Sequence, residues 1–230
     1  MLYTLLDVTY LAIMKIMMLF MVLAVFSTTT QADDGWQSLF NGKDLTGWRP
    51  NAYPESWSVV DGTIRTQATQ ASSHLFFVGD KREGEFVPFK NFVLELSARS
   101  EKNSNSGLFF HTDFQTRNAA KHLLNGYEVQ LNSSEREKRK TGSLYAIIDL
   151  SRSPVDESQW FKVRITVRNK HILVQLDEKT VIDYTEPENV MRPAERVGRK
   201  LKLEGGAIAL QGHDPGSIFY FKDIRIKVLP

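Results

Sequence analysis

Strict alternation of apolar and polar side chains is the feature that most constrains how this chain can fold. In segment 92–99, Phe, Leu, Leu and Ala at the even positions alternate with Val, Glu, Ser and Arg at the odd positions. In segment 161–168, Phe, Val, Ile and Val alternate with Lys, Arg, Thr and Arg. Because successive side chains of a strand point to opposite faces, both segments are predicted to be β-strands with one face in a core.

Turn signals separate further short segments of the same kind. Asp61-Gly62 lies between the β-formers 57–60 and 63–65, and this dipeptide favours a tight hairpin. Another strand is predicted over 144–148, a helical turn within 116–125, and a long loop with a helical turn over 186–204. About a dozen short strands with little helix predict an all-β fold, an antiparallel jelly-roll β-sandwich.

The last predicted strand changes its pattern halfway along. Phe219 and Phe221 occupy odd positions, whereas Ile224, Ile226 and Val228 occupy even ones. A period of two cannot change parity without a slip of one residue. The sequence therefore predicts a β-bulge near residues 222–223.

The N-terminal segment has the order of a secretory signal. Lys15 precedes the apolar run Ile16–Phe26 of eleven residues, and small residues follow up to Ala32. We expect residues 1–32 to be a signal peptide, with Met14 as an alternative start, because eleven residues are too few to span a bilayer comfortably. An uncleaved membrane anchor is the alternative. Cleavage after Ala32 leaves a single domain over 33–230 with no stable membrane span.

Composition narrows the class of protein. The chain contains no cysteine and has a formal net charge of +2, which gives no electrostatic case for binding nucleic acid. A domain of this length can be stabilised by its hydrophobic core without disulfides. Together with the export signal, these features are consistent with a bacterial periplasm, cell surface or extracellular location.

A polar pair interrupts an otherwise apolar predicted strand. Over 126–131, Tyr127, Val129 and Leu131 share one face, and Glu128 and Gln130 share the other. Two interpretations are open at this point. The polar pair either lines the floor of a binding groove or faces water on an ordinary half-exposed strand.

Five segments, taken together, resemble the 3-keto-disaccharide hydrolase family, formerly a domain of unknown function. The resemblance extends over nearly all of 36–230. The segments are Leu39-Phe40-Asn41-Gly42-Lys43-Asp44-Leu45-Thr46-Gly47-Trp48, Asn105-Ser106-Gly107-Leu108-Phe109-Phe110, Gly126-Tyr127-Glu128-Val129-Gln130, Thr141-Gly142-Ser143-Leu144-Tyr145, and Leu210-Gln211-Gly212-His213-Asp214 continuing into 219–226.

This resemblance implies a concanavalin-A-like jelly roll of the lectin and glucanase type, acting on sugars oxidised to a ketone at C3. Ordinary glycoside hydrolysis needs two carboxylates, whereas the matching strand offers only Glu128. A 3-keto sugar needs less, because the carbonyl acidifies the C2–H bond and one base can start loss of the C1 substituent. Glu128 and His213 are the candidate base and acid, in either order. Gln130, Gln211, His111, Tyr145 and Asn105 are the candidate substrate-binding residues.

Two further expectations concern ligands. No metal-binding spacing is present, and the candidate ligands for a structural calcium are Asp33, Asp34 and Asp44 with backbone oxygens. The alternative function is a non-catalytic carbohydrate-binding module that presents Trp48, Trp57 or Tyr145 to a sugar face. The remaining histidines, His74, His122 and His171, show no spacing that indicates ligation, and we expect them to be structural.

Overall fold

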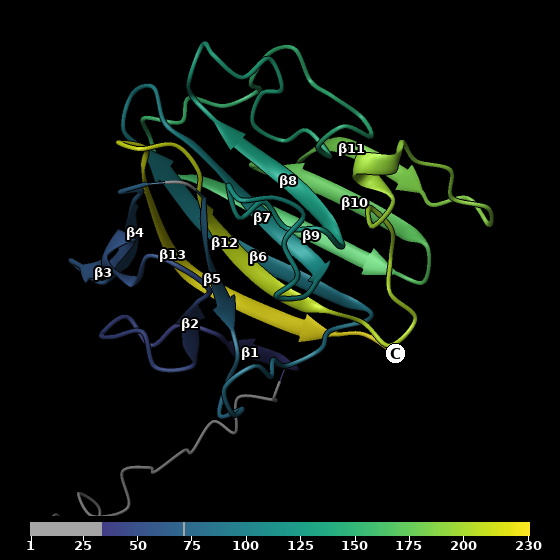
Figure 1. Cartoon of the computed structure of the whole chain (residues 1–230), viewed down its shortest axis with the longest axis horizontal. Coiled ribbons are helices and arrows are strands. Elements are labelled where there is room, and N and C mark those ends of the chain that lie inside the picture. The colour runs from purple at the N-terminus through teal and green to yellow at the C-terminus, as the bar shows by residue number, and fades with distance from the viewer. Residues whose placement is uncertain (1–33, 71) are drawn as a thin grey trace, which may run out of the picture. The chain divides into compact units, whose positions relative to one another are not determined.

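Two stacked antiparallel sheets form the protein (Figure 1). The computed structural model describes residues 34–70 and 72–230, so the predicted signal peptide 1–32 and the alternative start at Met14 lie outside the described residues. Over the described part, the only helical elements are the 3-10 turns Pro54–Ser56 and Ala194–Arg196. The predicted antiparallel β-sandwich is confirmed.

The larger sheet has the strand order β11-β10-β9-β6-β13-β4-β3, with β1 paired to β13. The smaller sheet has the order β2-β5-β12-β7-β8. In the larger sheet the strands are β1 (Trp36–Ser38), β3 (Trp57–Val60), β4 (Thr63–Gln67), β6 (Phe92–Ser100), β9 (Phe161–Arg168), β10 (His171–Leu176), β11 (Lys179–Thr185) and β13 (Ile218–Val228). In the smaller sheet they are β2 (Trp48–Pro50), β5 (Ser73–Phe77), β7 (Asn105–Thr112), β8 (Tyr127–Asn132) and β12 (Ala207–Gly212).

The hydrophobic core lies between the two sheets, where the apolar faces of the alternating strands meet. Leu94 of β6 pairs with Ile165 of β9, and both side chains are fully buried in the core. From the other sheet, Leu108, Val129 and Leu210 reach the same core. Burial of each such side chain contributes roughly 1.5–3 kcal/mol, which locks the register of every strand.

The predicted irregularities of the chain are present. The pairing of β13 with β6 slips between Lys222 and Arg225, with Asp223 at φ 54°, so the predicted bulge is confirmed. β3 and β4 form the predicted hairpin, in which Asp61 and Gly62 both have positive φ. The bulge brings both halves of the last strand's apolar pattern to the core face.

Two local predictions were wrong. Segment 116–125 forms no helical turn, because Thr116 bridges Leu123 and the side chain of Asn118 accepts a hydrogen bond from the backbone of His122. Segment 144–148 is a turn and not a strand, since Leu144 makes isolated bridges to Val129 and Ile148. Among the described residues, no helix is long and apolar enough to cross a bilayer.

Candidate functional site

Strand β8 is buried on both of its faces. Tyr127 and Val129 belong to the core, and on the opposite face Glu128 is 5% exposed and Gln130 is 1% exposed. An ordinary half-exposed strand would leave that second face in water. The structure therefore excludes the half-exposed interpretation, because other parts of the chain cover the polar pair.

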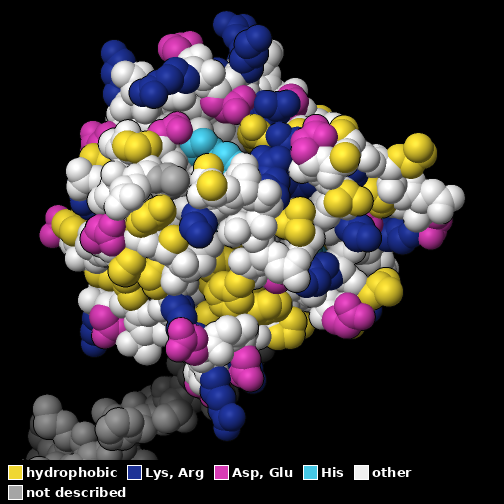
Figure 2. Space-filling model, viewed as in Figure 1, with side chains coloured by type: hydrophobic (Ala, Val, Ile, Leu, Met, Phe, Trp, Pro, Cys, Tyr) yellow, Lys and Arg dark blue, Asp and Glu magenta, His cyan; other side chains and the backbone are white. Residues whose placement is uncertain are grey.

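The cover is held by a second, smaller apolar cluster on the outer face of the five-stranded sheet. Leu123 of segment 113–125 is fully buried there against Phe109 and Phe76, and Phe114 packs at its edge. Figure 2 shows this side of the molecule, where histidine side chains reach the surface beside lysine or arginine and acidic groups. The apolar contacts explain how an irregular segment is fixed over the sheet.

A small cavity lies under this cover. Its volume is about 30 Å³, room for roughly one or two water molecules. Its walls come from the sheet, from the turn after β12, and from three covering segments, 113–125, 144–148 and 186–204. The lining residues are Phe109, Arg117, His122, Leu123, Glu128, Gln130, Tyr145, Arg199, Gln211 and His213.

Five of the seven residues predicted for the site, Tyr145 among them, thus line one cavity. Glu128 and Gln130 come from β8, Gln211 from β12 and His213 from the turn after it. No side chain at position 107 could coexist with this arrangement, because a Cβ there would lie 2.7 Å from Oε1 of Glu128. Because Gly107 has no side chain, the Glu128 carboxylate can lie directly over its backbone.

Glu128 forms a buried ion pair with Arg199, a residue that the sequence did not indicate. Nη2 of Arg199 lies 3.3 Å from Oε2 of Glu128, and Nη1 donates to the Gly126 carbonyl. Burial raises the pKa of Glu128, while the charges of Arg199 and His213 oppose that rise. The carboxylate is therefore more basic than an exposed glutamate and still has a cation beside it.

The loop that carries Arg199 is fastened to the sheet at both ends. Glu186 is buried and accepts hydrogen bonds from the Tyr127 hydroxyl over 2.5 Å and from the Leu201 backbone over 2.8 Å. Arg192 also donates to the hydroxyls of Tyr127 and Tyr184. Burial and the Glu186 carboxylate raise the pKa of Tyr127, so its hydroxyl stays a donor. These contacts position the loop over the cavity.

His213 is connected to Gln130 through two intermediate side chains. Nδ1 of His213 lies 2.8 Å from Oδ1 of Asp214, whose Oδ2 accepts from Nδ2 of Asn105 over 3.3 Å. Oδ1 of Asn105 in turn accepts from Nε2 of Gln130 over 2.8 Å. Asn105 is buried and does not line the cavity, so it orients its neighbours and does not face a ligand there.

The environment of His213 favours its protonated form. Burial alone lowers the pKa of His213, but the hydrogen bond to Asp214 and the charges of Asp214 and Glu128 outweigh it, and the net shift is upward. The same hydrogen bond holds the pKa of Asp214 below its usual value. The contact therefore favours an imidazolium beside a carboxylate.

His122, expected to be structural, also lines the cavity. Its ring stacks on that of His213 with centroids 5.3 Å apart and an interplanar angle of 24°. Burial and the positive charges of His213 and nearby arginines lower the pKa of His122 to about 4. The stacked pair thus combines a neutral imidazole with one that is readily protonated.

Two glutamines leave buried acceptor atoms without a donor. Oε1 of Gln130 and Oε1 of Gln211 have no hydrogen-bond partner within the described protein, and Nε2 of Gln211 lies 3.2 Å from Nε2 of His74. Buried polar atoms in native proteins are normally paired, and leaving one unpaired costs about 1–3 kcal/mol. Both oxygens can accept hydrogen bonds from hydroxyl groups of a ligand.

Tyr145 does not present an open stacking face. The guanidinium groups of Arg139 and Arg196 lie over its ring at 4.5 and 4.9 Å from the centroid. Its hydroxyl donates to Glu137 over 3.1 Å. The predicted sugar-stacking role therefore requires these arginines to move, although Tyr145 does line the cavity.

His111 lies outside the cavity, contrary to the expected substrate contact. Both ring nitrogens face backbone groups, Nε2 at 2.9 Å from the Lys90 carbonyl and Nδ1 at 3.0 Å from the Lys202 amide. The amide must donate, so Nε2 carries the proton and donates to Lys90. Burial lowers the pKa of His111, and the ring serves as a neutral brace between two loops.

The ligand sites considered from sequence lack support among the described residues. In residues 34–70 and 72–230, no three His, Asp or Glu side chains converge as a metal site would require. Asp33 lies outside that part, and Asp44 accepts hydrogen bonds from Asn41 and Thr46 within a turn. Trp48 and Trp57 are buried in the core and donate to Leu39 and Ser73, so neither offers a sugar platform.

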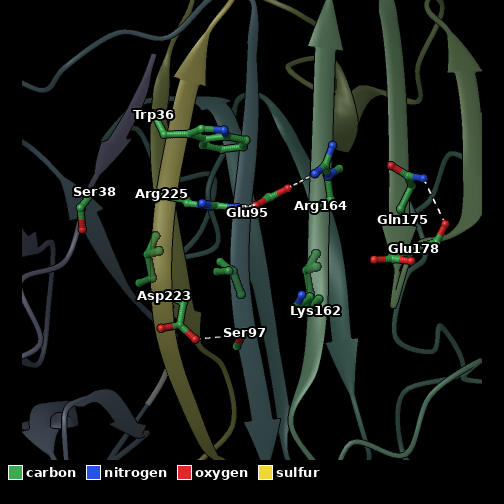
Figure 3. A pocket seen from close by; sticks show the side chains of 13 residues that line it. Trp36, Ser38, Glu95, Ser97, Lys162, Arg164, Gln175, Glu178, Asp223 and Arg225 are labelled. Carbon is green, nitrogen blue, oxygen red and sulfur yellow. Dashed lines mark hydrogen bonds and ion pairs between the residues drawn. The ribbon is translucent and has the colours of Figure 1, made fainter. Parts of the chain in front are cut away.

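A larger hollow, of about 860 Å³, lies on the outer face of the eight-stranded sheet (Figure 3). Its charged side chains largely pair with one another, since Glu95 contacts both Arg225 and Arg164 and Ser97 donates to Asp223. Such a cross-strand ladder is typical of a solvated sheet face. It contains no buried polar atom that lacks a hydrogen-bond partner, and we place the candidate site at the smaller cavity.

The fold and cavity define a β-sandwich protein with a buried polar cavity that is covered by loops on one sheet. Residues 35–227 match the model of the 3-keto-alpha-glucoside-1,2-lyase-like domain. The chain therefore belongs to this family of carbohydrate-active proteins, as the sequence motifs predicted.

The chain is also similar to a protein of known sequence and to solved structures. The chain is 24% identical to the 3-keto-disaccharide hydrolase of Bacteroides thetaiotaomicron over 85% of its own length and 79% of the relative's. A candidate glycosyl hydrolase from Parabacteroides distasonis has the same fold, with a TM-score of 0.68, 23% identity and coverage of 85% and 94% of the two chains. A Bacillus subtilis protein of unknown function with a galectin-like fold superposes with a TM-score of 0.55 at 11% identity, covering 84% and 94%.

Proposed function

We propose that this protein cleaves 3-keto-glycosides by removing the proton at C2 and releasing the C1 substituent. One observation carries the proposal. Glu128 and His213, from distant parts of the chain, line the same buried cavity with only one carboxylate among its walls. That set suits proton abstraction next to a ketone better than a two-carboxylate glycosidase mechanism. The name of the Bacteroides relative supports the same substrate class.

In the proposed reaction, Glu128 is the base and His213 is the acid. The Glu128 carboxylate takes the C2 proton, and the electron pair of the C2–H bond forms an enediolate with the C3 ketone. The enediolate then expels the oxygen of the C1 substituent, and His213 gives that oxygen its proton. The raised pKa values of Glu128 and His213 favour a basic carboxylate and a protonated imidazole.

Arg199 supplies positive charge next to the base. Its guanidinium is buried and charged, and it lies within the cavity wall beside Glu128. Fixed charge in a site without bulk water stabilises a developing oxyanion strongly. The unpaired oxygens of Gln130 and Gln211 accept hydrogen bonds from sugar hydroxyls in this proposal.

Substrate entry requires the covering segments to move apart. A cavity of about 30 Å³ is far smaller than a sugar ring. Contacts that hold the covering segments together include the hydrogen bond from Arg117 to the Glu195 carbonyl, the ion pair of Lys202 with Asp113 and the packing of Arg196 on Tyr145. Loop opening of this kind is a common step before chemistry in enzymes.

Release of the aglycone from a 3-keto-glucoside tests the proposal. Glu128→Gln and His213→Ala should each lower kcat at least 100-fold, the usual scale for loss of a general base or acid. Glu178→Gln and His171→Ala are matched controls on the larger sheet and should retain full activity. Wild-type-like turnover in both site variants would refute the roles assigned to Glu128 and His213. Absence of turnover on any 3-keto-sugar by the wild type would refute the substrate class.

We propose in addition that the protein acts outside the bacterial cytoplasm. The support is the order of basic, apolar and small residues over 15–32. Expression of the full chain followed by N-terminal sequencing of the exported fraction should yield a protein that starts at Asp33. Recovery of the full chain in the cytosol alone would contradict this proposal.

A further inference from the structure

The candidate cavity is surrounded by more positive than negative charge. Arg117 and Arg199 line it, and Arg196 packs on Tyr145, which also lines it. Only Arg199 has a carboxylate partner, Glu128, whereas Arg117 and Arg196 form no ion pair with any residue in the described part of the chain. Two guanidinium charges at the cavity therefore have no carboxylate partner within residues 34–70 and 72–230.

Two carboxylates that contact cavity-lining side chains have partners of their own. Asp214 accepts hydrogen bonds from His213 and Asn105. Glu137 contacts Arg139 and the Tyr145 hydroxyl. Neither acid is available to balance Arg117 or Arg196, so the excess positive charge persists with the cover closed.

Both unpaired arginines also have buried donor atoms without acceptors. Nε of Arg117 and Nη1 of Arg196 have no hydrogen-bond partner within the described protein. A buried donor on a charged group is costly to leave unpaired. The pKa of His122 reflects the same positive potential. Burial lowers it most, followed by the charge of His213, and the charges of the three arginines, Arg117, Arg199 and Arg196, lower it further.

On these grounds we infer that the site takes a sugar bearing a carboxylate, as in a uronic acid, and that Arg117 and Arg196 bind this group. The inference rests on the proposed function for the sugar itself and adds the charged substituent. A carboxylate would pair with the planar donor set of each guanidinium and offset the excess charge. The acceptors on Gln130 and Gln211 would still be served by the hydroxyls of the same ring.

A second explanation of the charge is that it serves only the enediolate formed during the reaction. That oxyanion exists after proton abstraction, so residues devoted to it would not affect binding of an unreactive sugar. Arg117 and Arg196 belong to the covering segments, not to the sheet that carries Glu128. The affinity for an unreactive sugar, measured in the wild type and in arginine variants, therefore distinguishes the two explanations.

The test is calorimetric titration of the full folded protein with glucuronate and with glucose, neither of which carries the 3-keto group. Glucuronate should bind at least about tenfold more tightly, and added NaCl should reduce this preference. Arg117→Gln and Arg196→Gln should each reduce the preference several-fold while the melting temperature stays close to wild type. Arg168→Gln, an exposed arginine at the end of β9, is the matched control and should change nothing.

Equal affinity for the two sugars, or a preference that survives both arginine substitutions, would overturn the inference. A parallel assay with a neutral 3-keto-glucoside keeps the two proposals separable. Turnover of that substrate without a preference for glucuronate refutes the carboxylate site alone. A glucuronate preference that depends on Arg117 and Arg196, without turnover of any 3-keto-sugar, supports the carboxylate site and refutes the proposed chemistry.

Discussion

Oδ1 of Asp214 lies 2.8 Å from Nδ1 of His213, and this contact determines the state of the imidazole in the candidate site. It assigns the Nδ1 proton to the bond with Asp214 and leaves Nε2 as the nitrogen available for proton transfer. It also raises the pKa of His213 against the effect of burial. Asp214 therefore acts on the site through His213, without lining the cavity itself.

Replacement of Asp214 by Asn should shift the pH profile of activity. His213 acts as an acid in the proposed reaction, so activity is lost as the pH rises through its pKa. Without the Asp214 charge that pKa falls, and the alkaline limb of kcat should move to lower pH, with kcat at pH 8 reduced about tenfold or more. Asp183→Asn, which removes the corresponding partner of exposed His171, is the control. An unchanged alkaline limb in Asp214→Asn would contradict the role of this contact.

Gly107→Ala should impair activity more than stability. The new Cβ would lie 2.7 Å from Oε1 of Glu128, and this carboxylate end of a flexible side chain is the part that can move. Displacement of a catalytic group by about 1 Å can cost roughly 100-fold in rate. Turnover of a 3-keto-glucoside and a thermal melt measure the two effects. A large loss of folding stability with full residual activity would show that Glu128 does not depend on this space.

Glu186→Gln should loosen the loop that carries Arg199. The buried carboxylate accepts from Tyr127 and from the Leu201 backbone, and glutamine replaces it with a neutral acceptor and an extra donor. We expect a loss of about 1–3 kcal/mol in the free energy of unfolding and faster amide exchange across 186–201. Glu188→Gln alters an exposed pair with Lys170 and should have little effect. Unchanged exchange across the loop would refute the anchoring role.

Stability should fall as the pH is lowered from about 6.5 toward 4. Burial lowers the pKa values of His74, His111 and His122, the last to about 4, so at these three residues the unfolded chain binds more protons than the folded one in this window. Glu128 and His213, whose pKa values are raised, act in the opposite direction but are outnumbered by the three histidines. The free energy of unfolding then rises with pH, by up to about 1.4 kcal/mol per pH unit for each such histidine.

Urea unfolding at several pH values measures this slope. His122→Asn removes one of the three contributions and should flatten the slope, most clearly between pH 6 and 4.5. His171→Asn, a substitution at an exposed histidine, serves as the comparison. A slope that is identical in the wild type and in His122→Asn would show that His122 is not held neutral by the fold.

The strands, their buried faces and the bulge of β13 could be predicted because each depends on neighbours two or three positions away. Alternation in β6 and β9, the Asp61-Gly62 turn and the change of parity near Asp223 are all local signals. The motifs also identified the family and brought Glu128 and His213 forward as a pair. Their meeting at one cavity depends on how β8 and the end of β12 are placed in the same sheet.

The covering segments could not be predicted, because their conformation depends on contacts between residues far apart in the chain. Arg199 reaches Glu128 across 71 positions, and its loop is held by contacts such as that of Glu186 with Tyr127. His111 turns away from the cavity since two backbone groups from other loops occupy its nitrogens. The sequence of such segments has no periodic pattern of apolar and polar residues that would predict their conformation.

The sequence by itself thus determined the all-β fold, the family and the polar face of β8. Only the tertiary structure decided that this face is covered, that arginines and a second histidine surround it, and which predicted residues share the cavity. The physical reason is one of range. Side-chain alternation is set by the geometry of a single strand, whereas the cover is set by hydrogen bonds, ion pairs and apolar contacts that form after distant segments have been brought together.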